Sequence, residues 1–451
     1  MSDLQITAGE RTEGQAQLPP QPKTVRETGL ELSLLAELVA KHLFSAGKTL
    51  LPVLTARLRL SINVLREVLD FMVAEQLAEV AWRGDTDIDV QYQLTSAGRQ
   101  RTAAWLERSP YSGPAPVPLD EYRALLQRQS ALLPPVAAQA LTAEFADDCL
   151  PAQVRELVGA ALHAHRSLLL HGPSGSGKTT LARRLGRLLQ GTVGVPYAVA
   201  VGQEIMQVYD SAIHHPPPAQ APRPMGERRS IDSRWALCGR PVLHMGAELA
   251  LDMLDLRHDP FSGSYQAPPQ VKAAGGLVIV DDLGRQRIPA AELLNRFTQP
   301  LDTGVEQLAL QGGRKFSVPF DVTMIFVTSL EPQAVLDPSS LRRLGYKVHV
   351  GPLGENAYRT LFRQECRTMG IVHDEVALRY LIEELHRGDG QPLLASFPRD
   401  ILSRIADFAA FTGQSPAVSV ATIDQAWSSM FATTGVQLAG IPDTNLFERI
   451  E

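Results

Sequence analysis

The chain has 451 residues, of which 44% are hydrophobic and 20% charged, and its formal net charge is −6. This length predicts two or three domains, and the composition is that of an ordinary soluble globular protein. The negative charge argues against a protein that coats nucleic acid through bulk electrostatics, and no apolar run is long enough to span a bilayer. The chain start lacks the pattern of a secretory signal, so we expect a cytoplasmic protein. Cys149, Cys238 and Cys366 lie far apart and are expected to be buried, inert thiols.

The first part of the chain predicts a tail followed by a small helical domain. Residues 1–27 are rich in Gln, Pro, Thr and Gly, with little to bury, so we expect a disordered tail. Residues 28–110 show three helical patterns, two β-like runs around the Gly84-Asp85 turn and a further helix. This order is that of a winged helix-turn-helix domain.

A proline-rich segment follows the winged helix-turn-helix pattern. Residues 111–118 contain three prolines and a glycine, which predicts a linker between two folding units. Residues 111–150 as a whole are expected to form this linker and connecting helices. A second irregular loop, over 219–229, lies inside the next domain, and such long inserts are often functional or mobile.

An apolar strand, a glycine-rich turn and a helix start follow one another from Leu168 to Leu181. Glycines in such a turn let successive backbone amides point at the phosphates of a nucleotide at the helix N-terminus. A lysine at the end of the turn reaches the β- and γ-phosphates, and the hydroxyl after it can bind Mg²⁺. The residues predicted to bind ATP are Gly172, Pro173, Ser174, Gly175, Ser176, Gly177, Lys178, Thr179 and Thr180.

Two further apolar strands end in polar residues suited to the same site. Residues 276–280 run into Asp281 and Asp282, and ligands bind at the carboxyl ends of such parallel strands. Asp281 would hold Mg²⁺ through water, and Asp282 would polarise the water that attacks the γ-phosphate. The strand over 322–327 ends in Thr328 and Ser329, which can hydrogen-bond the γ-phosphate or that water. A β-hairpin is predicted just before it, over 306–320.

The order of these motifs, continued by Leu341-Arg342-Arg343-Leu344 and Ser396-Phe397-Pro398-Arg399-Asp400, resembles the AAA+ ATPase superfamily. It is most similar to the branch with a β-hairpin before sensor 1, which includes the MoxR-type ATPases. The resemblance covers roughly residues 150–435. It implies an α/β fold with a P-loop AAA+ parallel-sheet core over 151–350, a small α-helical lid over 351–435, and a C-terminal tail over 436–451.

The resemblance also implies roles for individual residues. Lys178 and Thr179 match Walker A, Asp281 and Asp282 match Walker B, and Thr328 with Ser329 falls at sensor 1. Arg343 matches the arginine finger, with Arg342 as its alternate, and Arg399 matches sensor 2. A guanidinium suits these positions because it can meet two phosphate oxygens at once. A finger acts on a neighbouring subunit's nucleotide, so the resemblance implies a homo-oligomeric ring, a hexamer.

Two positions depart from the family pattern. The second Walker B acid is usually Glu, whereas Asp282 is one methylene shorter and could leave the water less well placed. Sensor 1 is usually Asn, whereas here Thr328 or Ser329 must act with a shorter reach. Both changes keep the type of hydrogen bond, so we expect an active or slow ATPase.

The segment between the phosphate loop and Asp281 is where ring ATPases commonly place loops that grip their substrate. Residues 245–270 contain Phe261 and Tyr265 beside glycine and serine. Either aromatic could grip a polypeptide, or both could pack this segment onto the domain. His214, His215, His244 and His258 lack metal-ligand spacing, so we expect solvated or packed histidines.

Three functions remain open from the sequence. The first is an ATP-hydrolysing ring that remodels or assembles protein partners, like a MoxR-type chaperone, with the winged helix as an adaptor. The second is a DNA-binding motor or transcription-linked ATPase, although Glu67, Asp70 and Glu75 leave the expected DNA-reading helix close to neutral or acidic. The third is a slow switch in which ATP mainly drives assembly. The sequence therefore predicts ATP and Mg²⁺ as ligands and protein as the preferred partner.

Overall fold

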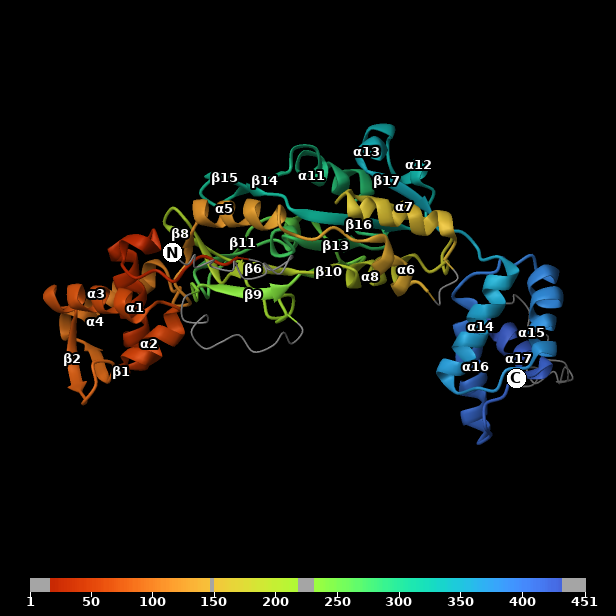
Figure 1. The fold of residues 1–451 in the computed structure, drawn as a ribbon, viewed down its shortest axis with the longest axis horizontal. Coiled ribbons are helices and arrows are strands. Elements are labelled where there is room, and N and C mark those ends of the chain that lie inside the picture. Colours follow the sequence, from red (N-terminus) through yellow and green to blue (C-terminus); the bar gives the residue numbers. More distant parts are fainter. Residues whose placement is uncertain (1–16, 147–149, 218–230, 432–451) are drawn as a thin grey trace, which may run out of the picture. The chain divides into compact units, whose positions relative to one another are not determined.

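The computed structural model describes residues 17–146, 150–217 and 231–431 (Figure 1). These residues form two compact units. The first contains residues 17–146, 151–172 and 178–349, and the second contains residues 150, 173–177 and 350–431. The loop expected over 219–229, the C-terminal tail expected over 436–451 and Cys149 lie outside the described residues.

The N-terminal part of the first unit has the helices and the hairpin expected from the sequence, together with a two-residue strand at Thr49–Leu50 that was not predicted. Ser61 begins one helix and Thr95 another, and each side chain accepts a hydrogen bond from a backbone N–H three residues later. The three strands form an antiparallel sheet in the order β1-β3-β2, packed against the helices around a shared apolar core. The elements are α1 (Leu32–Ala46), β1 (Thr49–Leu50), α2 (Leu51–Leu58), α3 (Ile62–Ala74), β2 (Ala78–Arg83), β3 (Val90–Leu94) and α4 (Ser96–Arg108).

The disordered tail expected over residues 1–27 is wrong for residues 17–27, which pack against the first unit. Val25 is buried, and its N–H donates to Glu67 Oε2 at 2.8 Å. A short 3-10 helix, η1 (Arg26–Thr28), then leads into α1. Residues 17–27 are held largely by hydrogen bonds of backbone groups. Amino-acid composition gives no information about such hydrogen bonds.

The linker expected over residues 111–118 is also packed. Tyr111 and Ala115 are buried in the N-terminal core, and Ala115 N–H donates to Leu58 O at 2.9 Å. Strand β4 (Val117–Pro118) then pairs with β7 at the edge of a sheet, where a proline costs no ladder hydrogen bond. The N-terminal elements and residues 151–172 and 178–349 therefore belong to one compact unit, and this segment does not separate them.

A mixed five-stranded sheet connects these parts, in the order β11-β12-β8-β7-β4. Its strands are β4, β7 (Ala198–Val201), β8 (Glu204–Gln207), β11 (Arg257–Asp259) and β12 (Ser264–Gln266). Two antiparallel pairs accompany it: β6 (Thr192–Pro196) with β9 (Trp235–Gly239), and β14 (Val305–Ala309) with β15 (Lys315–Pro319). The second pair is the hairpin predicted from the sequence. Short helical segments in and beside this region are α5 (Leu119–Ser130), α6 (Ala138–Glu144), η2 (Leu251–Leu254) and α10 (Pro269–Lys272).

The core of the first unit is a parallel sheet in the order β10-β13-β16-β5-β17, which confirms the predicted α/β fold class. On one face, α8 packs so closely that a Cβ on Gly186 would lie 2.9 Å from Val242. On the other face, Phe297 of α11 clusters with Val278 and Phe326, and Figure 1 shows α8 and α11 on opposite sides of the sheet. The elements are α7 (Ala152–His163), β5 (Leu168–His171), α8 (Lys178–Arg187), β10 (Val242–Met245), β13 (Gly276–Val280), α11 (Ala290–Thr303), β16 (Val322–Thr328), α12 (Pro332–Val335), α13 (Pro338–Arg343) and β17 (Tyr346–His349).

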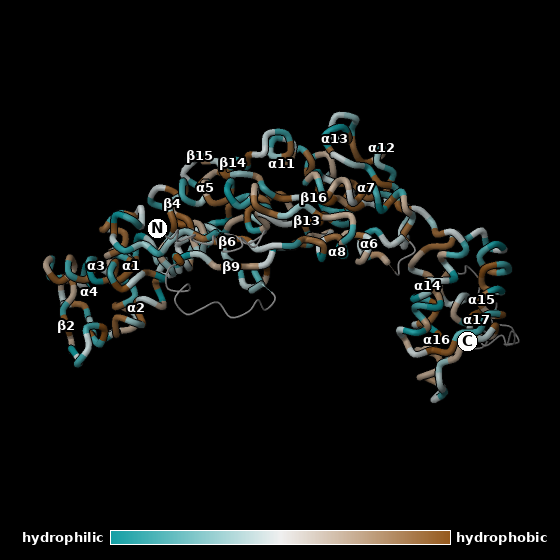
Figure 2. Tube along the Cα trace, viewed as in Figure 1, coloured by the Kyte–Doolittle hydropathy of each residue, from teal (hydrophilic) through white to brown (hydrophobic). Residues whose placement is uncertain are grey.

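The second unit is a small helical bundle, as the helical patterns predict. Apolar and polar residues alternate along its helices in Figure 2, as expected for amphipathic helices around one core. Its elements are α14 (Glu355–Met369), α15 (Glu375–Tyr380), a π-helical turn η3 (Leu381–His386), α16 (Phe397–Thr412) and α17 (Val420–Met430). Within the described residues, no helix has the length and apolar character needed to cross a membrane.

Candidate nucleotide site

The glycine-rich turn connects β5 to α8 in the conformation that its glycines allow. Gly175 and Gly177 have φ values of 81° and 91°, a region that other residues rarely adopt. Gly175 belongs to the second unit, and its carbonyl accepts a hydrogen bond from Ser396 N–H of the same unit at 2.9 Å. Backbone amides in such a turn are available to surround an anion.

Lys178 and Thr179 begin α8 at the end of this turn. Lys178 is buried, and its Nζ donates to Gly172 O at 2.9 Å. Burial lowers the pKa of Lys178, while Asp281 and Asp282 act in the opposite direction. The lysine is thus held across the turn, where it could reach a bound phosphate.

Thr179 and Asp281 meet although they are far apart in the sequence. Thr179 Oγ1 donates to Asp281 Oδ1 at 3.1 Å, and Asp281 is buried at the end of β13. A hydroxyl and a carboxylate are the hard oxygen ligands that Mg²⁺ prefers. These two side chains therefore fit the magnesium position expected from the sequence.

His244 is a member of this cluster that the sequence did not reveal. It lies in β10, and its Nε2 is 3.0 Å from Asp281 Oδ2. Strand β10 pairs in parallel with β13, so His244 lies one strand away from the aspartate. We expected a solvated or packed histidine here. The only signal in the sequence was the short apolar run around it, which does not indicate the neighbouring strand.

Asp282 adopts an unusual backbone conformation for a residue with a side chain, with φ at 53°. Its N–H donates to Asp281 Oδ1 at 3.0 Å, and its carbonyl accepts from Arg285 N–H at 2.8 Å. Asp tolerates this left-handed region better than most residues do. The turn therefore gives the two neighbouring carboxylates different settings: Asp281 is held in the cluster, and Asp282 is exposed.

Thr328 ends β16, the strand that lies between β5 and β13, and Ser329 follows it. Thr328 is buried, its hydroxyl donates to Leu283 O at 2.7 Å, and it accepts from Leu330 N–H at 3.1 Å. Ser329 is half-buried, and its hydroxyl makes no hydrogen bond to any described residue. Of the two sensor 1 candidates, Ser329 is thus the one with a hydroxyl available for a ligand.

The two expected arginine-finger residues end α13 and differ in their contacts. Arg343 Nε lies 3.0 Å from Asp302 Oδ2, and its Nη1 donates to Ser339 Oγ at 2.6 Å. Arg342 is exposed and makes no ion pair with any residue that the structure describes. Arg399, the expected sensor 2 residue, is exposed in the first turn of α16 in the second unit.

The aromatic residues between the phosphate loop and Asp281 have different environments. Phe261, in the turn between β11 and β12, is 92% exposed, whereas Tyr265 is 4% exposed and packs in the core.

His214 is buried, accepts a hydrogen bond from Asp210 N–H and contacts Lys272 O, as expected for a packed histidine. The described residues contain no group of three or more side chains that could hold a metal ion without other ligands.

Cys238 and Cys366 are both free and buried, as predicted. Burial raises the pKa of each thiol to about 11. Burial thus favours the protonated thiol of both cysteines over the reactive thiolate.

Comparisons with known proteins give one partial family match. Residues 354–429, in the helical bundle, match the family described as "Domain of unknown function (DUF8689)". No curated protein matches the chain.

Several solved structures share a distant likeness. NtrX from Brucella abortus is 13% identical with a TM-score of 0.40, over 75% of this chain and 64% of that chain. The same protein in complex with ATP is 14% identical with a TM-score of 0.39, over 76% and 63%. A RuvB variant from Thermotoga maritima is 12% identical with a TM-score of 0.34, over 61% and 67%. The chain thus spans less than two thirds of the NtrX chains.

Proposed function

We propose that the chain binds and hydrolyses ATP as an AAA+-type ATPase. The observation that carries this proposal is the contact between Thr179 and Asp281, at 3.1 Å, next to the glycine turn and the buried Lys178. A phosphate-binding turn, a lysine and a hydroxyl–carboxylate pair are the parts that nucleoside triphosphate hydrolysis requires.

Each residue would have a distinct part in the reaction. Lys178 would bind the β- and γ-phosphates, and the turn amides would orient them. Thr179 and Asp281 would hold Mg²⁺, which neutralises phosphate charge when bound. Asp282 would accept a hydrogen bond from the attacking water, and the Ser329 hydroxyl would hold that water or the γ-phosphate from the neighbouring strand.

The arginines point to assembly of several copies. Arg342 and Arg343 lie on the surface at the end of a short helix, which suits a cation that acts on the nucleotide of a neighbouring subunit. We propose a homo-oligomeric ring, with a hexamer as the expected size. Arg399 would act within the same chain as sensor 2.

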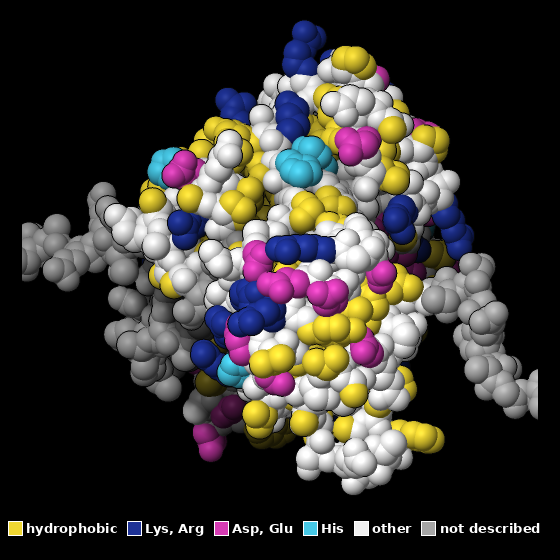
Figure 3. Space-filling view, turned by 90° about the vertical axis from the view of Figure 1, so that its right-hand side faces the viewer, with side chains coloured by type: hydrophobic (Ala, Val, Ile, Leu, Met, Phe, Trp, Pro, Cys, Tyr) yellow, Lys and Arg dark blue, Asp and Glu magenta, His cyan; other side chains and the backbone are white. Residues whose placement is uncertain are grey.

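Protein is the partner that we favour. Phe261 is almost fully exposed in the turn between β11 and β12, so its ring would be available for contact with apolar side chains of a polypeptide. Basic and acidic side chains are interspersed on the one face that Figure 3 shows. DNA-directed activity through the winged helix-type domain, or a slow assembly switch, are the alternatives.

The first experiment tests hydrolysis. Single-turnover ATP hydrolysis is measured for the wild type, for Asp282→Asn and for the control Asp70→Asn, which removes an exposed carboxylate far along the chain. We expect Asp282→Asn to slow hydrolysis by about 10²–10⁴-fold, as for loss of a general base, while a fluorescent ATP analogue still binds. Equal rates for the wild type and Asp282→Asn would remove Asp282 from the mechanism.

The second experiment separates the partners. Steady-state hydrolysis is measured with duplex DNA over a range of salt concentrations, and in parallel with unfolded polypeptide. Stimulation by polypeptide supports the remodelling function. Stimulation by DNA alone, weakening as salt rises, would replace it with the DNA-directed function.

A further inference from the structure

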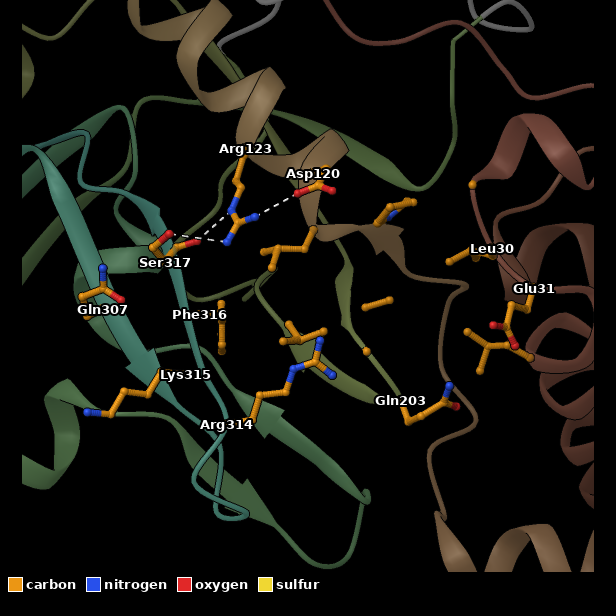
Figure 4. Close-up of a pocket in the computed structure, with 17 residues that line it drawn as sticks. Leu30, Glu31, Asp120, Arg123, Gln203, Gln307, Arg314, Lys315, Phe316 and Ser317 are labelled. Atoms are coloured by element: carbon orange, nitrogen blue, oxygen red, sulfur yellow. Dashed lines mark hydrogen bonds and ion pairs between the residues drawn. The ribbon is translucent and has the colours of Figure 1, made fainter.

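A polar cavity lies in the first unit, built from segments that are not part of the nucleotide site. It has a volume of about 680 Å³ and is lined by the start of α1, the start of α5, the turn between β7 and β8, and the β14–β15 hairpin. Figure 4 shows Arg123 and Arg314 extending from two of these elements, with Glu31 on the side of α1. The cavity thus lies between the start of α1 and the β14–β15 hairpin, which precedes β16.

The side chains of the two arginines in this cavity differ in the hydrogen bonds that they make. Arg123 is fully engaged: it donates to Ser317 O at 2.8 Å and to Asp120 Oδ1 at 2.8 Å. The side chain of Arg314 makes no hydrogen bond or ion pair with any described residue, so its guanidinium N–H groups are available to a ligand. An unpaired guanidinium at a cavity is matched best by an oxyanion that accepts two of its N–H groups.

The turn opposite Arg314 is shaped to receive this side chain. Gly202 has a φ of 68°, and a Cβ built on it would overlap Arg314 Nη1. The glycine therefore leaves the space in which the guanidinium lies, next to Gln203 in the cavity wall.

The charges of the wall favour a small anion over a large one. Arg123, Arg314 and Lys315 give three positive charges, and Glu31 and Asp120 give two negative charges, so the balance is +1. Because Asp120 is paired with Arg123, the remaining positive charge lies at the hairpin. Glu31 on the other wall would repel a polyanion such as nucleic acid.

We propose that this cavity binds a small molecule bearing a carboxylate or phosphate group, with Arg314 as the residue that recognises the oxyanion. Such a ligand would contact α1 and the β14–β15 hairpin together. The hairpin is separated from β16 by only two residues, Phe320 and Asp321, so the ligand would sit close in sequence to the strand that carries Thr328 and Ser329.

The test measures thermal unfolding of the full chain with ADP and Mg²⁺ in excess, so that anions do not act through the phosphate loop. Succinate and inorganic phosphate are titrated separately, each against NaCl of equal ionic strength. The proteins are the wild type, Arg314→Gln and the control Arg83→Gln, which removes an exposed arginine of β2 outside the cavity.

We expect succinate or phosphate to raise the unfolding temperature of the wild type and of Arg83→Gln. Arg314→Gln should need about tenfold more anion for the same rise, because a hydrogen-bonded charge is lost. A response to succinate alone assigns a carboxylate ligand, and a response to phosphate alone assigns a phosphate ligand. The proposal is overturned if Arg314→Gln responds like the wild type, or if neither anion stabilises the wild type beyond NaCl.

Discussion

A buried arginine connects three segments of the first unit, and its removal should be costly. Arg234 is 1% exposed and Asp232 is fully buried. The guanidinium donates to both Asp232 oxygens, with Nη2 to Oδ2 at 2.8 Å. Its Nη1 also donates to the carbonyls of Thr28 at 2.9 Å and Pro116 at 3.1 Å. One side chain thus links the N-terminal segment, the Pro-rich segment and the strand β9 region.

The expected effect of Arg234→Met follows from these contacts. Methionine fills similar space but leaves the Asp232 carboxylate buried without its cation, and breaking a buried pair in this way costs about 3–5 kcal/mol. The carbonyls of Thr28 and Pro116 also lose a donor, which adds to the loss of stability. Replacing both partners, as in Asp232→Asn with Arg234→Met, should recover part of it.

Denaturant unfolding followed by tryptophan fluorescence measures this effect, since Trp235 is buried beside Arg234. The control is Arg83→Met, an exposed arginine whose replacement should change the free energy of unfolding by less than about 0.5 kcal/mol. If Arg234→Met is as stable as this control, the ion pair does not hold the three segments together, and the reasoning fails.

Three further predictions concern the site, the exposed turn and pH. His244→Ala should weaken nucleotide binding about tenfold in the presence of Mg²⁺ and little in its absence, because His244 positions Asp281. Nucleotide is titrated with and without Mg²⁺, and an equal loss of affinity in the two titrations would contradict this prediction. Phe261→Ser should leave the unfolding temperature unchanged but abolish stimulation of hydrolysis by polypeptide, and retained stimulation would exclude the turn as a contact. Burial lowers the pKa of His386, which contacts Tyr358 Oη at 2.9 Å. Below about pH 6.5, His386 therefore binds a proton more readily in the unfolded chain than in the folded one. The free energy of unfolding should fall as the pH drops through this range, and the fall should be smaller in His386→Gln.

The sequence predicted the elements whose signals are local. The strands before the phosphate loop and before Asp281 are continuous apolar runs, and the structure gives them as β5 and β13. The glycine turn, the hairpin and the amphipathic helices of residues 350–431 also follow from neighbouring residues. Each of these patterns is set by contacts within a few residues, so it can be read without knowing the fold.

The features that the sequence did not predict depend on distant contacts. His244 joins the site because β10 pairs with β13, and nothing near residue 244 indicates that pairing. Residues 17–27 and 111–118 appeared unable to pack, since they are polar or rich in proline. They are held instead by backbone hydrogen bonds, and Arg234 donates to the carbonyls of Pro116 and of Thr28, the residue that follows 17–27.

The backbone at Asp282 changes how its shorter side chain should be understood. Compared only by length, aspartate is a glutamate that lacks one methylene and reaches less far toward the attacking water. However, the φ of 53° places Asp282 in a left-handed turn, and this backbone conformation also determines the direction in which its side chain leaves the backbone. Aspartate tolerates the left-handed region better than most residues do. Residue type and backbone conformation are thus matched at this position. The reach of Asp282 is set by the turn as well as by the side chain, so the missing methylene alone is not evidence for slow hydrolysis.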